Sequence, residues 1–215
     1  MARPGNEARD ALLDAAEHVF AVQGIETASL RDISHEAGQR NNSAAQYHFG
    51  DRAGLVAAVF TRRMDAINER RLQMIAEIDE HDRNDVPSLV AALMVPLIEY
   101  VTTHDGWYGR FLVRTEFDHF AITVKTALPV SRPVLELSRR LMGCLDYLPK
   151  NIRRHRVAKM MTHYISAVAD WEWERDRGVT RLTPHELTQE VLATSCAMLL
   201  APQNIDAQSL KEIKS

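Results

Sequence analysis

Polar side chains between positions 40 and 48 carry donor and acceptor groups of the kinds that proteins use to contact a nucleic-acid duplex. Asn and Gln amides pair with adenine edges and Arg pairs with guanine, while Ser, Tyr and His reach phosphate or sugar oxygens. The composition of this segment therefore favours nucleic-acid recognition. Its candidate contact residues are Arg40, Asn41, Asn42, Ser43, Gln46, Tyr47 and His48.

Two short helices are predicted to position these side chains. The first begins after Ser29, which with Asp32 resembles a capping box, and it ends at Gly38. The second covers about residues 42–48 and has its cap at Asn41 or Asn42. An amphipathic helix with apolar residues at Leu12, Ala16, Val19 and Phe20 precedes both.

This arrangement is a helix-turn-helix, in which the second helix enters the major groove and the first helix holds it there. The inner contact between the two helices is expected from apolar residues, which are Leu30, Ile33, Ala37, Ala45 and Phe49. The pattern alone leaves open an incidental three-helix corner in an all-α protein.

The charge of the chain does not by itself indicate a nucleic-acid partner. The net charge is −3, and the first sixty residues contain five arginines against eight acidic residues. Because phosphate attraction acts over only about 8–10 Å at physiological salt, the local position of each arginine matters more than the sum. We expect the acidic residues of the first helix to face away from DNA.

The remainder of the chain is predicted to be helical as well. Apolar residues recur at helical spacing up to residue 200, Pro96 predicts a kink or break, and no stretch alternates like a strand. Apolar stretches such as residues 90–98 are too short to span a bilayer, and no export signal is visible at the N-terminus. We therefore expect a cytoplasmic, all-α protein.

Five short motifs occur in order along residues 11–60. They are LLDAA from Leu12, an aromatic-x-x-x-Gly pattern ending at Gly24, LRDI from Leu30, Ala37-Gly38, and YHFG from Tyr47. Together they resemble the N-terminal domain of the TetR family of regulators. Two departures are Gln39, where the family usually has an apolar residue, and one additional residue between Gly38 and Phe49. The departures predict a longer turn.

The resemblance implies a homodimer of about nine helices per chain. It implies an N-terminal three-helix DNA-binding domain at residues 1–50, and a larger effector-binding and dimerisation domain at residues 51–215. It adds Thr27, Ser29 and Arg52 as candidate phosphate contacts, and it matches Tyr47 and His48 to the end of the recognition helix.

The last two long helices, at about residues 149–177 and 184–200, are the expected dimer-forming pair. The pattern alone fits an internal core equally well, and the family resemblance favours a dimer. The candidate interface residues are Val157, Met161, Ile165, Val168, Leu187, Val191, Ser195 and Met198.

An effector pocket is expected between the middle helices, where aromatic residues concentrate. Ordinary core packing is the competing interpretation for each of these side chains. The candidate ligand-binding residues are Met94, Ile98, Trp107, Tyr108, Phe111, Phe117, His163 and Tyr164.

These expectations combine into one functional hypothesis, a repressor that an apolar or aromatic small molecule releases from operator DNA. No cofactor, membrane contact or catalytic residue is expected. A metal site at Glu116, Asp118 and His119 is disfavoured, because no second histidine lies four residues along a helix. The alternative hypothesis is a helical carrier or enzyme that retains a vestigial helix-turn-helix.

Overall fold

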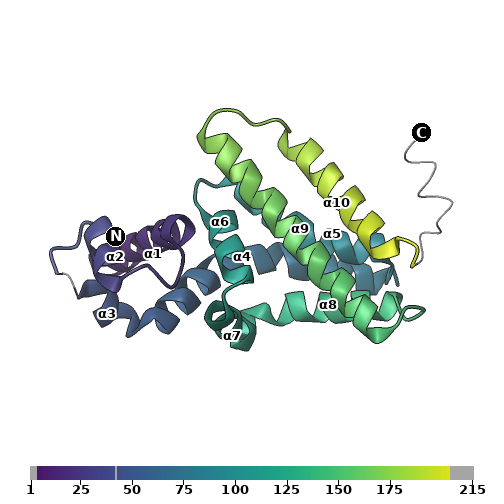
Figure 1. The fold of residues 1–215 in the computed structure, drawn as a ribbon, viewed down its shortest axis with the longest axis horizontal. Helices are drawn as coiled ribbons and strands as arrows, with labels where there is room; N and C mark the ends of the chain where they lie inside the picture. Colours follow the sequence, from purple (N-terminus) through teal and green to yellow (C-terminus); the bar gives the residue numbers. More distant parts are fainter. Residues whose placement is uncertain (1–3, 42, 204–215) are drawn as a thin grey trace.

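A computed structural model describes residues 4–41 and 43–203, and within these ranges all regular structure is helical (Figure 1). The expected all-α class is confirmed. The elements are α1 (Pro4–Gln23), α2 (Leu30–Glu36), α3 (Ala44–Phe49), α4 (Arg52–Glu80), α5 (Val86–Thr103), α6 (Tyr108–Glu116), α7 (His119–Ala127), the 3₁₀ turn η1 (Pro129–Ser131), α8 (Arg132–Cys144), α9 (Lys150–Asp176) and α10 (Pro184–Leu200).

The helices form two groups that α4 connects. Figure 1 shows α1, α2 and α3 at one end and the remaining helices beyond them, with α4 running from one group into the other. The buried side of α1, including Leu12, Ala16 and Phe20, packs against α2, α4 and α6. The N-terminal helices therefore share their hydrophobic core with α4 and α6.

Helix α5 is the apolar centre of the larger group. In the described part of the chain, α5 is the one helix that is long and apolar enough to cross a bilayer. The shorter stretch of residues 90–98 inside it was expected to be too short to do so. Helix α5 packs against α4, α8, α9 and α10, and ten of its residues are buried. This burial accounts for its apolar composition, as in the core helix of a globular protein.

Pro96 does not end α5. Proline lacks the N–H that would pair with the carbonyl one turn earlier, and its ring crowds that turn. Two side chains from other helices donate to carbonyls near this point: Arg71 Nη2 to Leu93 O at 3.2 Å, and the Tyr164 hydroxyl to Met94 O at 3.2 Å. The helix is continuous from Val86 to Thr103.

The start of α6 depends on a buried carboxylate from α9. Glu172, which is 1% exposed, accepts hydrogen bonds from the backbone N–H groups of Gly109 at 2.8 Å and Arg110 at 2.9 Å. These N–H groups lie in the first turn of α6 and have no partner within the helix. A side chain on Gly109 would lie 3.0 Å from Val168 Cγ1, so glycine permits this close approach.

We predict that Glu172 makes the stability of the protein depend on pH near neutrality. Burial raises the pKa of Glu172 from its ordinary value of 4.5 to about 7. Between these values the folded state holds a proton that the unfolded state has lost, so stability falls as the pH rises, by up to about 3 kcal/mol. Chemical denaturation of Glu172→Gln from pH 5 to pH 8 should show a weaker fall than wild type. The exposed Glu69→Gln variant is the control, and an unchanged pH dependence in Glu172→Gln would contradict the prediction.

Candidate nucleic-acid interface

Helices α2 and α3 form the expected helix-turn-helix. Ser29 caps α2, since its hydroxyl accepts a hydrogen bond from the Asp32 N–H at 3.0 Å, as the sequence predicted. Gly38, with φ of +66°, follows the end of α2. Helix α3 begins at Ala44 instead of near residue 42, so residues 37–43 lie between the two helices. Asn42, one of the predicted contacts, lies outside the described residues.

The buried hydroxyl of Ser34 joins α2 to α3. It donates to Leu30 O at 2.9 Å and accepts from the Ala45 N–H at 3.0 Å. Ala45 lies in the first turn of α3, where backbone N–H groups have no partner within the helix. Sequence analysis did not select Ser34. The sequence feature that could have identified Ser34 is a small hydroxyl side chain next to Ile33, on the buried side of α2.

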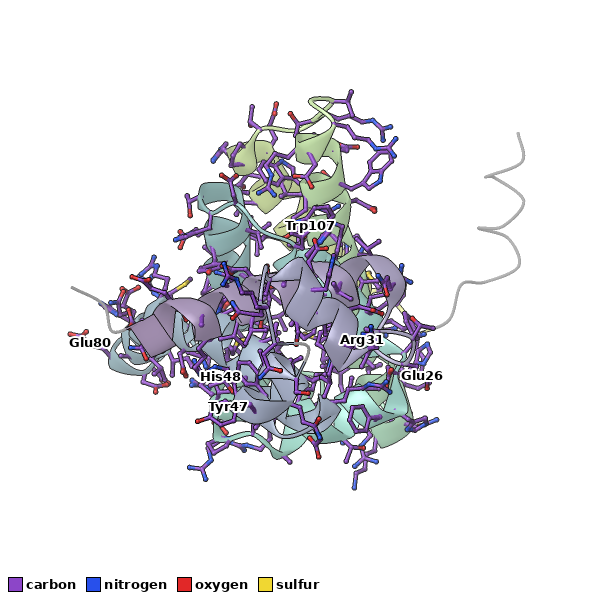
Figure 2. All side chains as sticks on the ribbon, turned by 90° about the vertical axis from the view of Figure 1, so that its left-hand side faces the viewer. Glu26, Arg31, Tyr47, His48, Glu80 and Trp107 are labelled. Carbon is purple, nitrogen blue, oxygen red and sulfur yellow. The ribbon has the colours of Figure 1, made fainter. Side chains whose placement is uncertain are left out.

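Helix α3 presents polar side chains to solvent. Tyr47 is 84% exposed, and Gln46 and Ser43 are exposed as well. Figure 2 views this end of the molecule, with Tyr47 and His48 on one side and Arg31 and Glu26 on the other. His48 is half-buried, and its ring meets the Tyr47 ring edge-on with centroids 5.3 Å apart. Among the predicted contact residues on α3, Gln46 and Tyr47 are therefore the most exposed to solvent.

The turn before α3 contributes two further exposed candidates. Arg40 is exposed, and no hydrogen bond joins its side chain to another of the described residues. The side-chain oxygen Oδ1 of Asn41 accepts a hydrogen bond from the Ser43 N–H at 2.9 Å, so this side chain helps to shape the turn. Arg40 is thus the basic group nearest to α3 along the turn.

The predicted phosphate contacts at Thr27, Ser29 and Arg52 also have structural partners. The Thr27 hydroxyl donates to Gln23 O, and Ser29 is occupied as the cap of α2. Arg52 Nη2 donates to Ala28 O at 3.1 Å, which ties the start of α4 to the loop before α2. Arg52 remains exposed and retains further N–H donors for a phosphate.

A side-chain carboxylate of the protein itself already caps the N-terminus of α4. The Asp51 carboxylate accepts a hydrogen bond from the Gly54 N–H at 2.9 Å and caps the helix. A carboxylate in this position occupies the donors that would otherwise favour a phosphate. Any phosphate contact at this point would therefore come from the side chain of Arg52.

Gly54 sets the distance between α3 and α4. A Cβ on this residue would lie only 2.1 Å from the carbonyl oxygen of Phe49, the last residue of α3. Gly50, between the two helices, has φ of +77°. Both glycines let α3 end directly against the first turn of α4, which fixes the angle at which α3 faces outward.

The acidic excess of the first sixty residues is partly neutralised by α4. Asp14 Oδ1 lies 2.6 Å from Arg62 Nη2 and 3.2 Å from Arg63 Nη2, and the buried carboxylate of Glu17 lies 2.7 Å from Arg63 Nε. On α2, Glu36 lies 2.9 Å from His18 of α1. These acids face neighbouring helices, which explains how an acidic N-terminal segment can still present Arg40 and Arg52 outward.

A cavity of about 490 Å³ lies between helices α4 to α9, and the η1 turn also lines it. Among the eight predicted ligand-binding residues, only Tyr164 lines it. Four others, Met94, Ile98, Tyr108 and Phe111, are buried in the core.

The remaining three predicted ligand-binding residues lie away from this cavity. Trp107 stacks beneath Arg110, with the guanidinium carbon 3.7 Å from the ring centroid. Phe117 is 74% exposed after the end of α6. The ring of His163 lies 2.8 Å from the Thr194 hydroxyl, between α9 and α10.

Most members of the predicted dimer stripe face the interior of this chain. Six of the eight residues are buried, because these sides of α9 and α10 pack on the chain's own core: Val157, Ile165, Val168, Leu187, Val191 and Ser195. Met161 lines the cavity, and Met198 is half-buried. Helix α10 presents a different row to solvent, formed by Ala193, Ala197 and Leu200.

Comparison with known proteins agrees with this architecture. Residues 12–59 match the profile of the bacterial regulatory proteins of the tetR family. The HTH-type transcriptional regulator AcrR of Shigella flexneri is 24% identical over 173 residues, which are 76% of this chain and 77% of that protein.

Two solved structures share the fold. The fatty acid degradation regulator FadR from Bacillus halodurans has a TM-score of 0.53 and 17% identity, covering 91% of this chain and 100% of that one. NalD, the secondary repressor of the MexAB-OprM multidrug efflux pump in Pseudomonas aeruginosa, has a TM-score of 0.52 and 15% identity, covering 94% and 100%.

The matched segment contains α2, α3, Ser34 and Gly54, which together build the helix-turn-helix. The related proteins are described as regulators or repressors. In the described residues, no group of three His, Cys, Asp or Glu side chains is arranged to hold a metal ion. Residues 12–59, which contain the helix-turn-helix, are thus similar to the bacterial regulatory proteins of the tetR family.

Proposed function

We propose that this protein is a dimeric repressor that binds operator DNA through α3 and leaves it when a small molecule occupies the cavity. The observation that carries the proposal is the rigid placement of α3, whose exposed Gln46 and Tyr47 face outward from a helix fixed by Ser34 and Gly54. The similarity to a transcriptional regulator, AcrR, and to the fold of a repressor, NalD, supports this function. Residues 1–50 would form the DNA-binding domain and residues 51–215 the effector-binding and dimerisation domain. A protein that binds operator DNA would act in the cytoplasm.

The proposed DNA contacts divide into two kinds. Gln46 is the candidate for base recognition, because its amide has the donor and acceptor pair that adenine requires. The candidates for phosphate, sugar or turn contacts are Thr27, Ser29, Arg40, Asn41, Ser43, Tyr47, His48 and Arg52. Phosphate contacts would hold the protein in register without reading sequence.

A dimer would place two copies of α3 on successive turns of the major groove. One short helix reading one half-site binds weakly, and linking two multiplies the affinity. The outward row of α10, Ala193, Ala197 and Leu200, offers small and apolar side chains on which a second copy can pack closely. We propose this face, in place of the buried stripe, as part of the interface.

Two helices connect the cavity to the DNA-binding helices. Helix α4 carries Gly54 against α3 and Met64 at the cavity wall. Helix α6 places Leu112 at the cavity, and its Arg114 donates from Nε to Ala21 O at 3.1 Å, near the end of α1. A ligand that shifts either helix would alter the spacing of the two reading helices, so ligand and DNA would oppose each other reciprocally.

We predict that Gln46→Ala loses sequence discrimination. One bidentate base contact is worth about 1–3 kcal/mol, so specific affinity should fall roughly 5- to 150-fold while non-specific binding stays unchanged. Arg52→Ala should weaken binding to all sequences alike. The measurement is a gel-shift titration at several salt concentrations, with DNA from upstream of the protein's own gene and a scrambled duplex.

The exposed Gln73→Ala variant on α4 is the matched control and should bind like wild type. If the wild-type protein retains no upstream fragment even at low salt, the proposed function is wrong.

We predict that Gly54→Ala weakens DNA binding without any change at the contact surface. The new methyl group must displace the end of α3, because it would meet the Phe49 carbonyl oxygen. Such overpacking costs about 1–3 kcal/mol and would tilt the reading helix. Stability by denaturation and specific DNA affinity should both fall.

Gly143→Ala is the control for this substitution. Gly143 lies in α8 with open space where its Cβ would stand, so alanine should leave stability unchanged or slightly higher. Equal DNA affinities for Gly54→Ala and Gly143→Ala would contradict the role assigned to Gly54.

A further inference from the structure

Arg71 is a buried cation without a carboxylate partner. It lies on α4 and is 2% exposed, which makes it one of the largest fully buried side chains in the described residues. No Asp or Glu in the described part of the chain lies within ion-pair distance of its guanidinium. Arginine remains charged in proteins, so this positive charge is present inside the protein.

The contacts of Arg71 are to neutral acceptors. Its Nη1 donates to the Asn68 side-chain oxygen and lies 3.3 Å from Met64 Sδ, and its Nη2 donates to Leu93 O at 3.2 Å. Its buried Nε has no hydrogen-bond partner. A guanidinium has five N–H donors, so Nε–H and one N–H of Nη2 remain for another acceptor.

The guanidinium is held in one orientation. Asn68 accepts from Arg71 and donates from Nδ2 to Val130 O at 2.7 Å, which fixes the amide between α4 and the η1 turn. Leu93 O fixes the opposite end of the guanidinium on α5. Arg71 is therefore positioned before any ligand arrives, which lowers the entropy lost on binding.

The cavity of about 490 Å³ that Arg71 lines has apolar walls and an excess of positive charge. Leu97 and Val157 are among its apolar residues. Its charged lining residues are Arg71, Lys125, Arg154 and Glu116, and Glu116 is paired with Lys125 at 2.5 Å. Lys125 therefore neutralises Glu116, the one acidic lining residue, which leaves the positive charges of Arg71 and Arg154. Burial also lowers the pKa of Arg71, which shows that its charge is poorly solvated.

We propose that the cavity binds an amphipathic organic anion, with an apolar body along the walls and one carboxylate on Arg71. A carboxylate matches the planar pair of donors that Arg71 has left, and a charge-assisted pair in a buried site is stronger than a neutral hydrogen bond. The volume lies within the roughly 300–1,000 Å³ of small-molecule sites. This inference rests on the proposed function, since it names the chemical class of the effector.

The test uses three probes that share one apolar chain: decanoate, 1-decanol and decyltrimethylammonium. Calorimetric titration of the full chain, with no DNA present, should give decanoate a Kd about 10- to 100-fold lower than 1-decanol, with the cation weakest. In Arg71→Met, which keeps the apolar stem, decanoate and 1-decanol should bind equally. Arg71→Lys should keep part of the preference because it keeps the charge. Circular dichroism checks that each variant is folded.

Arg139→Met is the matched control, because Arg139 is exposed on α8 and does not line the cavity. It should retain the preference for decanoate. The proposal is overturned if decanoate binds no more tightly than 1-decanol, or if Arg71→Met keeps the preference.

A separate gel shift of wild type and Arg71→Met with upstream DNA tests the regulator proposal. Carboxylate binding by a protein that retains no such DNA would support the anion site and contradict the repressor function.

Discussion

The buried carboxylate of Glu17 holds the three N-terminal helices against the rest of the chain. Its Oε2 accepts from Arg63 Nε on α4 at 2.7 Å, and its Oε1 accepts from the backbone N–H of Trp107, just before α6, at 2.9 Å. Gly106 leaves room for it, since a Cβ there would lie 2.9 Å from Oε1. Glu17 therefore joins α1 to α4 and to the segment before α6, and removing one partner of a buried ion pair typically costs about 3–5 kcal/mol.

The consequence of this junction is that the DNA-binding helices and the cavity share their supports. Helix α4 places Gly54 under α3 and, further along, Arg71 at the cavity, while α6 touches α1 through Arg114 and the cavity through Leu112. Under the proposed function, a shift of a cavity wall would be transmitted to α1 and α3 through these packed helices. Because packed cores shift between discrete arrangements, small local changes can be converted into a new spacing of the reading helices.

Local features were predictable from the sequence, and features that depend on tertiary packing were not. The Ser29 cap and the all-helical class follow from residue types and spacing alone. The inward stripe of Val168 and Val191 was recognisable as buried, but a periodic pattern does not show whether a partner or the chain's own core covers it. In the sequence Arg71 looks like any solvent-exposed arginine, and only the packing of α5 and the η1 turn against α4 shows that it is buried. For the same reason the cavity lies among α4, α8 and α9, away from most of the aromatic cluster that suggested it.

Selection of bound duplexes from a random DNA pool, followed by sequencing, tests the central claim most directly. A symmetric pair of α3 helices must read two half-sites related by a two-fold axis. The account predicts enrichment of an inverted repeat whose half-site centres lie about one helical turn, or a multiple of it, apart. Enrichment of no motif, or of a motif without two-fold symmetry, would contradict it.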